Sequence, residues 1–114
     1  MTNFELFTLM FFALDSEYDS LTEKDSDLGQ YLSEINPFLW KDCTSADPAH
    51  FAKFERFMKD KSIGNDYGYS VLFDFLQTEN FYKGLPAHFL AIQKEDYIDY
   101  AKKYLSEPHK GGKN

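Results

Sequence analysis

A nucleophilic site is the first chemistry to consider, because Cys43, Asp47 and His50 lie within one short segment. A thiolate nucleophile needs a histidine aimed at it and often a third group that orients the imidazole. Nothing in this spacing forces that geometry, because Asp47 precedes Pro48 and is better used as the N-cap of a helix. His50 would then lie near a helix N-terminus, where its cationic form is disfavoured. We therefore expect no enzymatic activity, with an enzyme that uses Cys43 and His50 as an alternative.

Metal binding is the second chemistry to consider. Carboxylates recur at alternate positions from Asp15 onward, which is the spacing of a calcium loop. Such a loop needs glycine at its sixth position and an acidic residue at its twelfth, where this chain has Ser20 and Ser26. One cysteine and three histidines cannot build a closed zinc site. No glycine-rich phosphate loop is present either. We expect neither a metal ion nor a cofactor.

An acidic segment, residues 15–34, is the strongest signal in the chain. It has seven acidic residues and one basic residue, so it carries −6 of the chain's net charge of −7. Such a cluster disfavours direct binding of nucleic acid and attracts a basic protein. Tyr31, Phe38 and Trp40 could supply the aromatic anchors of an interface, although all three could instead fill the core. The candidate partner-binding residues are therefore Asp15, Glu17, Asp19, Glu23, Asp25, Asp27, Tyr31 and Trp40. The alternative is a solvated acidic surface without a partner.

The size and composition of the chain indicate one domain. It has 114 residues, and with 18% aromatic residues it can build a core without disulfides or metals. Its single cysteine, Cys43, cannot form an internal disulfide, which fits a reducing compartment. The apolar stretch at residues 4–14 is shorter than the roughly 20 residues that span a bilayer, and it lacks the basic flank of a signal peptide. We expect a soluble, cytoplasmic protein without membrane contact.

Hydrophobic spacing and end signals predict an all-α fold, a compact single-domain bundle of about five helices over residues 1–108. Thr2 and Glu5 have the spacing of a capping box at the first helix. Residues 67–82 carry apolar side chains on most sides, so we expect this helix to lie at the centre of the bundle. The polar, Gly-rich residues 109–114 are expected to form a frayed tail. The expected helices are residues 2–19, 25–35, 47–60, 67–82 and 94–105, with a short helical turn at 87–92.

Two stretches resemble a known group of proteins. They are LGQYLSEINPFLWKD, residues 28–42, and SADPAHFAKF, residues 45–54. With the size, acidity and aromatic content, they make the chain similar to small bacterial immunity proteins that neutralise ribonuclease toxins of contact-dependent inhibition systems. The resemblance implies a non-enzymatic inhibitor that binds a cognate, basic toxin domain and blocks its active site or the path of its substrate. It assigns no individual binding residue.

Two other functions agree with the same features. One is a small regulatory or scaffold protein that acts by self-association, as a homodimer for example, or by binding another protein. The other is a nucleic-acid mimic that blocks a DNA-binding protein, which differs from the toxin inhibitor only in its target.

Overall fold

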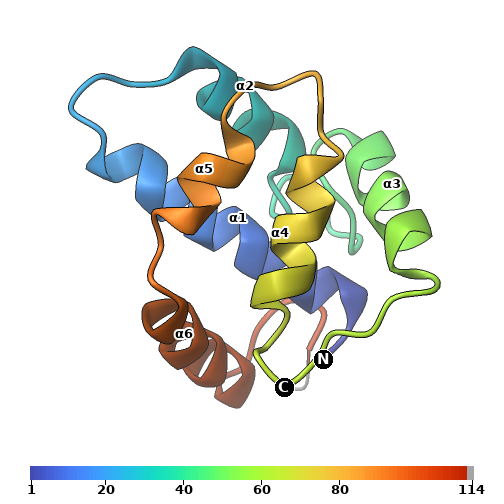
Figure 1. The fold of residues 1–114 in the computed structure, drawn as a ribbon. Coiled ribbons are helices and arrows are strands. Elements are labelled where there is room, and N and C mark those ends of the chain that lie inside the picture. The colour runs from blue at the N-terminus through green and yellow to red at the C-terminus, as the bar shows by residue number, and fades with distance from the viewer. Residues whose placement is uncertain (113–114) are drawn as a thin grey trace.

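The computed structural model describes residues 1–112, and within them it contains six α-helices and no β-strand (Figure 1). The all-helical fold is therefore confirmed. No helix among these residues is both long enough and apolar enough to cross a membrane. The helices are α1 (Asn3–Ser20), α2 (Ser26–Ile35), α3 (Pro48–Met58), α4 (Tyr69–Gln77), α5 (Leu85–Leu90) and α6 (Lys94–Ser106).

The central helix is α1, and the expectation that residues 67–82 occupy the centre is wrong. α1 packs against α2, α3 and α5, and its side chains from Phe4 to Met10 are all buried. The predicted central helix is shorter, because Tyr67 and Gly68 have positive φ angles and α4 ends at Gln77. With 9 residues, half the length of α1, α4 packs mainly against α5 and α6.

Side-chain caps fix the starts of three helices where the sequence predicts them. At α1, Thr2 Oγ1 accepts a hydrogen bond from Glu5 N at 3.0 Å, and Thr2 N donates to Glu5 Oε1 at 2.6 Å. Asp25 caps α2 by accepting from two backbone N–H groups. Asp47 caps α3, with Pro48 in its first turn. The predicted turn at residues 87–92 is the short helix α5, which begins after Gly84 at a φ of 80°.

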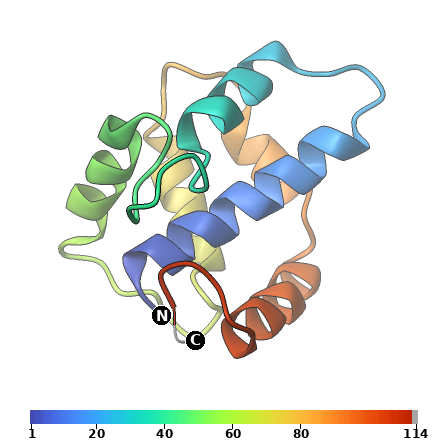
Figure 2. The same cartoon turned by 180° about the vertical axis from the view of Figure 1, so that it is seen from behind.

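Residues 107–112, which we call the C-terminal strap, fold back over α1 and the loop between α2 and α3 (Figure 2). His109 Nε2 lies 2.6 Å from Glu5 Oε2. Lys110 Nζ donates to the carbonyl oxygens of Pro37, at 2.8 Å, and of Trp40. The expectation of a frayed tail is therefore corrected for residues 109–112, since paired polar groups hold them. Residues 113–114 lie outside the described part of the chain.

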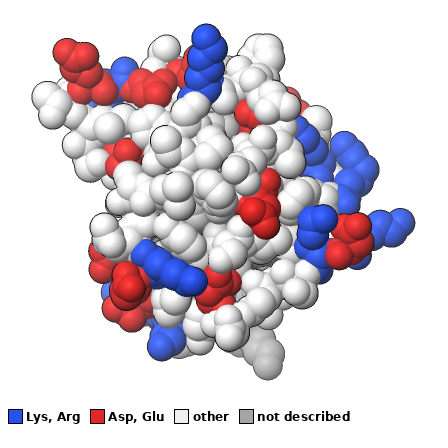
Figure 3. All heavy atoms as spheres, in the orientation of Figure 1, with Lys and Arg blue, Asp and Glu red and all other residues white. Residues whose placement is uncertain are grey.

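Charged side chains are unevenly distributed over the surface. Figure 3 shows that the area over α4 and α5 is largely uncharged, while Lys and Arg side chains gather on the side formed by α3. Phe81, in the loop before α5, is 86% exposed, and Leu90 at the end of α5 is 52% exposed. Basic and uncharged areas therefore lie on different parts of this face of the molecule.

Candidate protein-binding surface

The acidic segment does not form one surface, because α1 turns its carboxylates to different sides. Asp15 and Asp19, four residues apart, share one side of α1 and line a groove between α1 and α6. Glu17 lies between them in sequence and points instead toward α5, where it contacts His88. The helical period thus places the carboxylates of the segment on different sides of α1.

Glu17 and Asp25 form intramolecular contacts with His88. Their carboxylates lie 2.9 Å and 2.8 Å from the two ring nitrogens of His88. Burial opposes ionisation of His88, but the bonds to Glu17 and Asp25 outweigh it and raise its pKa. The bond to His88 in turn lowers the pKa of Asp25. Asp27 accepts a hydrogen bond from the backbone N–H of Lys83 at 3.2 Å, and Glu23 is exposed.

The groove between α1 and α6 combines apolar walls with an acidic rim. Its cavity volume is about 440 Å³. Leu9 and Tyr97 contribute to its buried walls, and the rim carries Asp15, Asp19 and Asp96. Within residues 1–112, none of these three carboxylates forms a salt bridge. Burial, with the nearby charge of Asp19, raises the pKa of Asp15. No ion pair among the described residues therefore neutralises these carboxylates, and a nearby cation, Lys24 Nζ, donates to the main-chain carbonyl oxygen of Asp19 at 3.1 Å.

An aromatic ridge, formed by Phe12, Phe38 and Tyr100, continues from this groove. The ring of Phe12 lies 5.6 Å from the ring of Phe38 and 5.6 Å from the ring of Tyr100, measured between centroids. Phe38 and Tyr100 are 49% and 46% exposed. Phe12 and Tyr100 also line the groove, so the ridge and the groove form one surface. In Figure 2 the backbone of α1 runs between α6 and the α2–α3 loop.

Trp40 and Tyr31 have opposite environments. Trp40 is 49% exposed in the α2–α3 loop, two residues after Phe38, and its indole N–H donates to the carbonyl oxygen of Ala46 at 3.0 Å. Tyr31 is completely buried, because it shares the core-facing side of α2 with Leu28 and Ile35. The prediction that Tyr31 contacts a partner is therefore corrected, and its ring fills the core.

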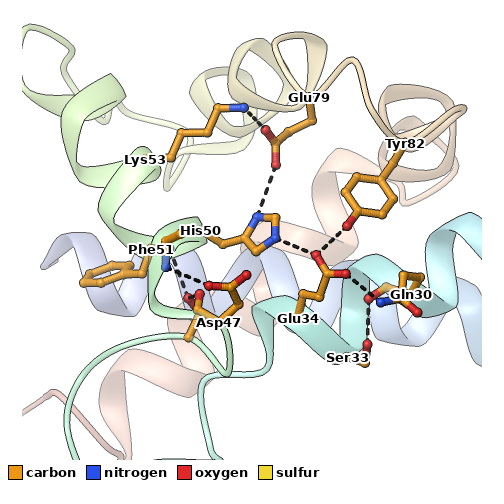
Figure 4. Close-up of polar contacts among 11 residues, drawn as sticks. Gln30, Ser33, Glu34, Asp47, His50, Phe51, Lys53, Glu79 and Tyr82 are labelled. Atoms are coloured by element: carbon orange, nitrogen blue, oxygen red, sulfur yellow. Dashed lines mark hydrogen bonds and ion pairs between the residues drawn. The ribbon is translucent and has the colours of Figure 1, made fainter.

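A polar cluster lies between α2, α3 and the segment after α4 (Figure 4). His50 Nε2 lies 2.7 Å from Glu34 Oε1, and its Nδ1 lies 3.7 Å from Glu79 Oε2. Lys53 forms an ion pair with Glu79, and the hydroxyl of Tyr82 donates to Glu34. Although Glu79 is buried, its partners His50 and Lys53 lower its pKa to about 2.

The charge state of His50 differs from the expectation. Its position near the start of α3 suggested that the cation would be disfavoured, but Glu79 and then Glu34 raise its pKa against the effect of burial. Both ring nitrogens of His50 face carboxylates, which leaves neither nitrogen directed at Cys43 as a base.

Three members of this region have the spacing of metal ligands. Atoms of Glu34, Asp47 and His50 lie within 4.8 Å of one another. Glu34, however, already accepts hydrogen bonds from Gln30, at 2.6 Å, and from Tyr82. Asp47 caps α3 by accepting from Ala49 N at 3.1 Å. A metal ion would have to replace these bonds, so internal hydrogen bonding accounts for the arrangement.

The sequence analysis missed three residues of the surface: Phe12, Asp96 and Tyr100. Asp96 lies in the first turn of α6, where the helix dipole favours an acidic residue. Asp96 and Tyr100 are four residues apart, so their shared side of α6 could have been found from the spacing. The spacing does not show that this side of α6 faces α1, because that contact depends on the packing of the whole fold.

Comparisons with known proteins do not place the chain in a group. Searches against protein-family models, curated proteins and solved structures each found no match.

Proposed function

We propose that the protein is a non-enzymatic inhibitor that binds and neutralises a basic protein domain, in the manner of immunity proteins against ribonuclease toxins. One observation carries this proposal: the exposed aromatic ridge is continuous with a groove whose three carboxylates form no salt bridge within residues 1–112. Aromatic side chains supply much of the binding energy of protein interfaces, and uncompensated charge favours a partner of the opposite sign.

The chemistry of a ribonuclease suits this surface. An enzyme that binds the phosphates of RNA is basic where it meets them. An inhibitor can cover that site by presenting carboxylates from Asp15, Asp19 and Asp96, while the aromatic ridge of Phe12, Phe38 and Tyr100 excludes water beside them. Long-range attraction between the charges would also speed the encounter.

The test is affinity capture from the native host with the tagged protein, at low and moderate salt, followed by an RNA cleavage assay of the retained protein. We expect a basic protein in near-equal amount, whose cleavage of RNA stops when one equivalent of this chain is added. A retained protein that is not basic, or RNA cleavage that continues in the presence of excess chain, would contradict the proposal.

Two matched double variants test the role of the groove in that capture. Asp15→Asn with Asp19→Asn removes two charges at the groove, and Glu55→Gln with Asp74→Asn removes two exposed charges elsewhere. At low salt the first pair should slow association more than the second. Equal association rates for the two double variants would show that the groove is not part of the binding surface.

A variant of Cys43 separates an inhibitor from an enzyme. Cys43 is an exposed free thiol. For an inhibitor, Cys43→Ala should leave neutralisation of the partner unchanged. Loss of function in a folded Cys43→Ala protein would favour the enzyme instead.

Self-association is the second candidate function, and the uncharged area over α4 and α5 favours it (Figure 3). Phe81 and Leu90 expose apolar surface in these segments. Light scattering at two protein concentrations would distinguish the two functions. A mass that stays monomeric agrees with an inhibitor, and a mass that doubles at the higher concentration agrees with a homodimer.

A further inference from the structure

We propose that the groove between α1 and α6 receives one arginine side chain of the partner. This inference rests on the proposed function and specifies the group that the surface recognises. It follows from three properties of the groove: its shape, its charge and the aromatic rings at its mouth.

The shape of the groove suits a long side chain with an apolar stem. The cavity has a volume of about 440 Å³, and Leu9, Ile92 and Tyr97 contribute apolar surface to it. Leu9 and Tyr97 are almost completely buried, so they belong to a preformed wall. The methylene groups of arginine can lie along such a wall while the charged end stays at the rim.

The charge of the groove favours a cation. Asp15 and Asp19 approach it from α1 and Asp96 from α6, so carboxylates lie on both sides. No lysine, arginine or histidine among residues 1–112 forms a salt bridge with any of them. The mutual repulsion of Asp15 and Asp19 contributes to the raised pKa of Asp15, and a bound cation would relieve it.

The aromatic rings favour arginine over lysine. Phe12 and Tyr100 line the groove with ring centroids 5.6 Å apart, and Tyr100 is 46% exposed. A planar guanidinium can stack on an aromatic ring while its N–H groups donate to two carboxylates at once. An ammonium group is a compact point charge and has no flat face to stack.

The test uses small probes, so it does not depend on the identity of the partner. N-acetyl-arginine amide, N-acetyl-lysine amide and the uncharged N-acetyl-citrulline amide are titrated into isotopically labelled protein, and the amide resonances are followed by NMR. We expect saturable shifts at Asp15, Asp96 and Tyr100 with the arginine probe, weaker binding of the lysine probe and no site-specific binding of the citrulline probe. Equal shifts with the citrulline probe, or none at about 50 mM arginine probe, would overturn the inference.

Two variants on α6 complete the experiment. Asp96→Asn should raise the Kd of the arginine probe about tenfold, since one charge-assisted contact is lost. Asp99→Asn removes the same charge from an exposed position of the same helix that does not line the groove, and it should leave the Kd within about twofold. If the two variants raise the Kd equally, the probe responds only to the net charge of the protein and the inference is rejected.

The outcomes separate this inference from the proposed function. If the arginine probe binds in the groove but the captured protein is not basic, only the proposed function fails. If a basic partner is captured and inhibited, but Asp96→Asn leaves its affinity unchanged, only the groove inference fails.

Discussion

His88 Nδ1 lies 2.9 Å from Glu17 Oε2, although 71 residues separate the two along the chain. This contact ties α5 to α1 and removes Glu17 from the acidic surface. The second ring nitrogen of His88 extends the link to Asp25, the N-cap of α2, at 2.8 Å. A single imidazole therefore connects three helices, and it does so with residues that the sequence suggested for a partner.

Replacing His88 should lower the stability of the fold. In His88→Ala both carboxylates lose their partner, and we expect the free energy of unfolding to fall by about 1 to 2 kcal/mol, since hydrogen bonds to charged groups contribute about that much at partly exposed sites. Urea denaturation gives the value. Lys102→Ala, at an exposed position of α6, is the control and should change it little. Equal stability of the two variants would show that the link contributes nothing.

Stability should depend on pH through all three histidines. Glu79 and Glu34 raise the pKa of His50, and carboxylate contacts outweigh burial to raise those of His88 and His109 above the ordinary 6.5. A folded-state pKa above the unfolded value means that the contribution is complete below pH 6.5 and is lost as pH rises through the folded value. For Glu79, whose pKa falls from 4.5 to about 2, the contribution is complete above pH 4.5 and is lost toward pH 2.

The maximum of stability should therefore lie at about pH 5 to 6, with declines on both sides. Urea midpoints at about pH 3, 5.5 and 8.5 would define the curve, and His88→Ala should flatten its alkaline side. A midpoint at the alkaline end as high as that in the middle would contradict the assignment of charged histidines.

Phe38 should contribute to partner binding and not to folding. Its ring is 49% exposed on the aromatic ridge, so Phe38→Ala should weaken binding of the captured partner by tenfold or more, as about 1.4 kcal/mol implies, with a small change in the urea midpoint. Phe81→Ala makes the same change at a residue that is 86% exposed in the loop before α5 and serves as the control. If Phe81→Ala loses more affinity than Phe38→Ala, the interface lies over α4 and α5 instead of on the aromatic ridge.

Gly68 should tolerate alanine less well than Gly84. Both have positive φ angles, 87° and 80°, which cost a residue with a Cβ about 1 kcal/mol. A Cβ at Gly68 would also lie 2.3 Å from Cδ1 of the fully buried Leu6, whereas at Gly84 the nearest atom, in His88, is 3.7 Å away. We expect Gly68→Ala to lose about 2 to 4 kcal/mol and Gly84→Ala about 1 kcal/mol in urea denaturation. Similar losses would show that α4 can move away from α1.

Local signals predict the helices well, because caps and breaks act within a few residues. The capping box of Thr2 and Glu5 and the Asp47–Pro48 start are present as expected. The position of the central helix was not predictable from apolar content alone. Residues 67–82 are rich in apolar side chains, but the positive φ of Tyr67 and Gly68 and the end at Gln77 shorten the helix.

The candidate surface was only partly predictable, for a reason that lies in helix geometry. Because successive residues turn by about 100° around a helix, Asp15 and Asp19 share a side and Glu17 lies on another. That division could have been read from the spacing. The neighbours of each side, His88 and Asp96, come from parts of the chain more than seventy residues away, and only the packed fold brings them there.

The C-terminal strap has a consequence for the thermodynamics of recognition. Lys110 binds the carbonyl oxygens of Pro37 and Trp40, on either side of Phe38 and Leu39. The loop that presents Phe38 and Trp40 is therefore ordered before a partner arrives. Immobilising such a loop during association would oppose binding entropically, and here most of that loss has already occurred during folding. A preorganised surface of this kind can give tight binding over a small contact area.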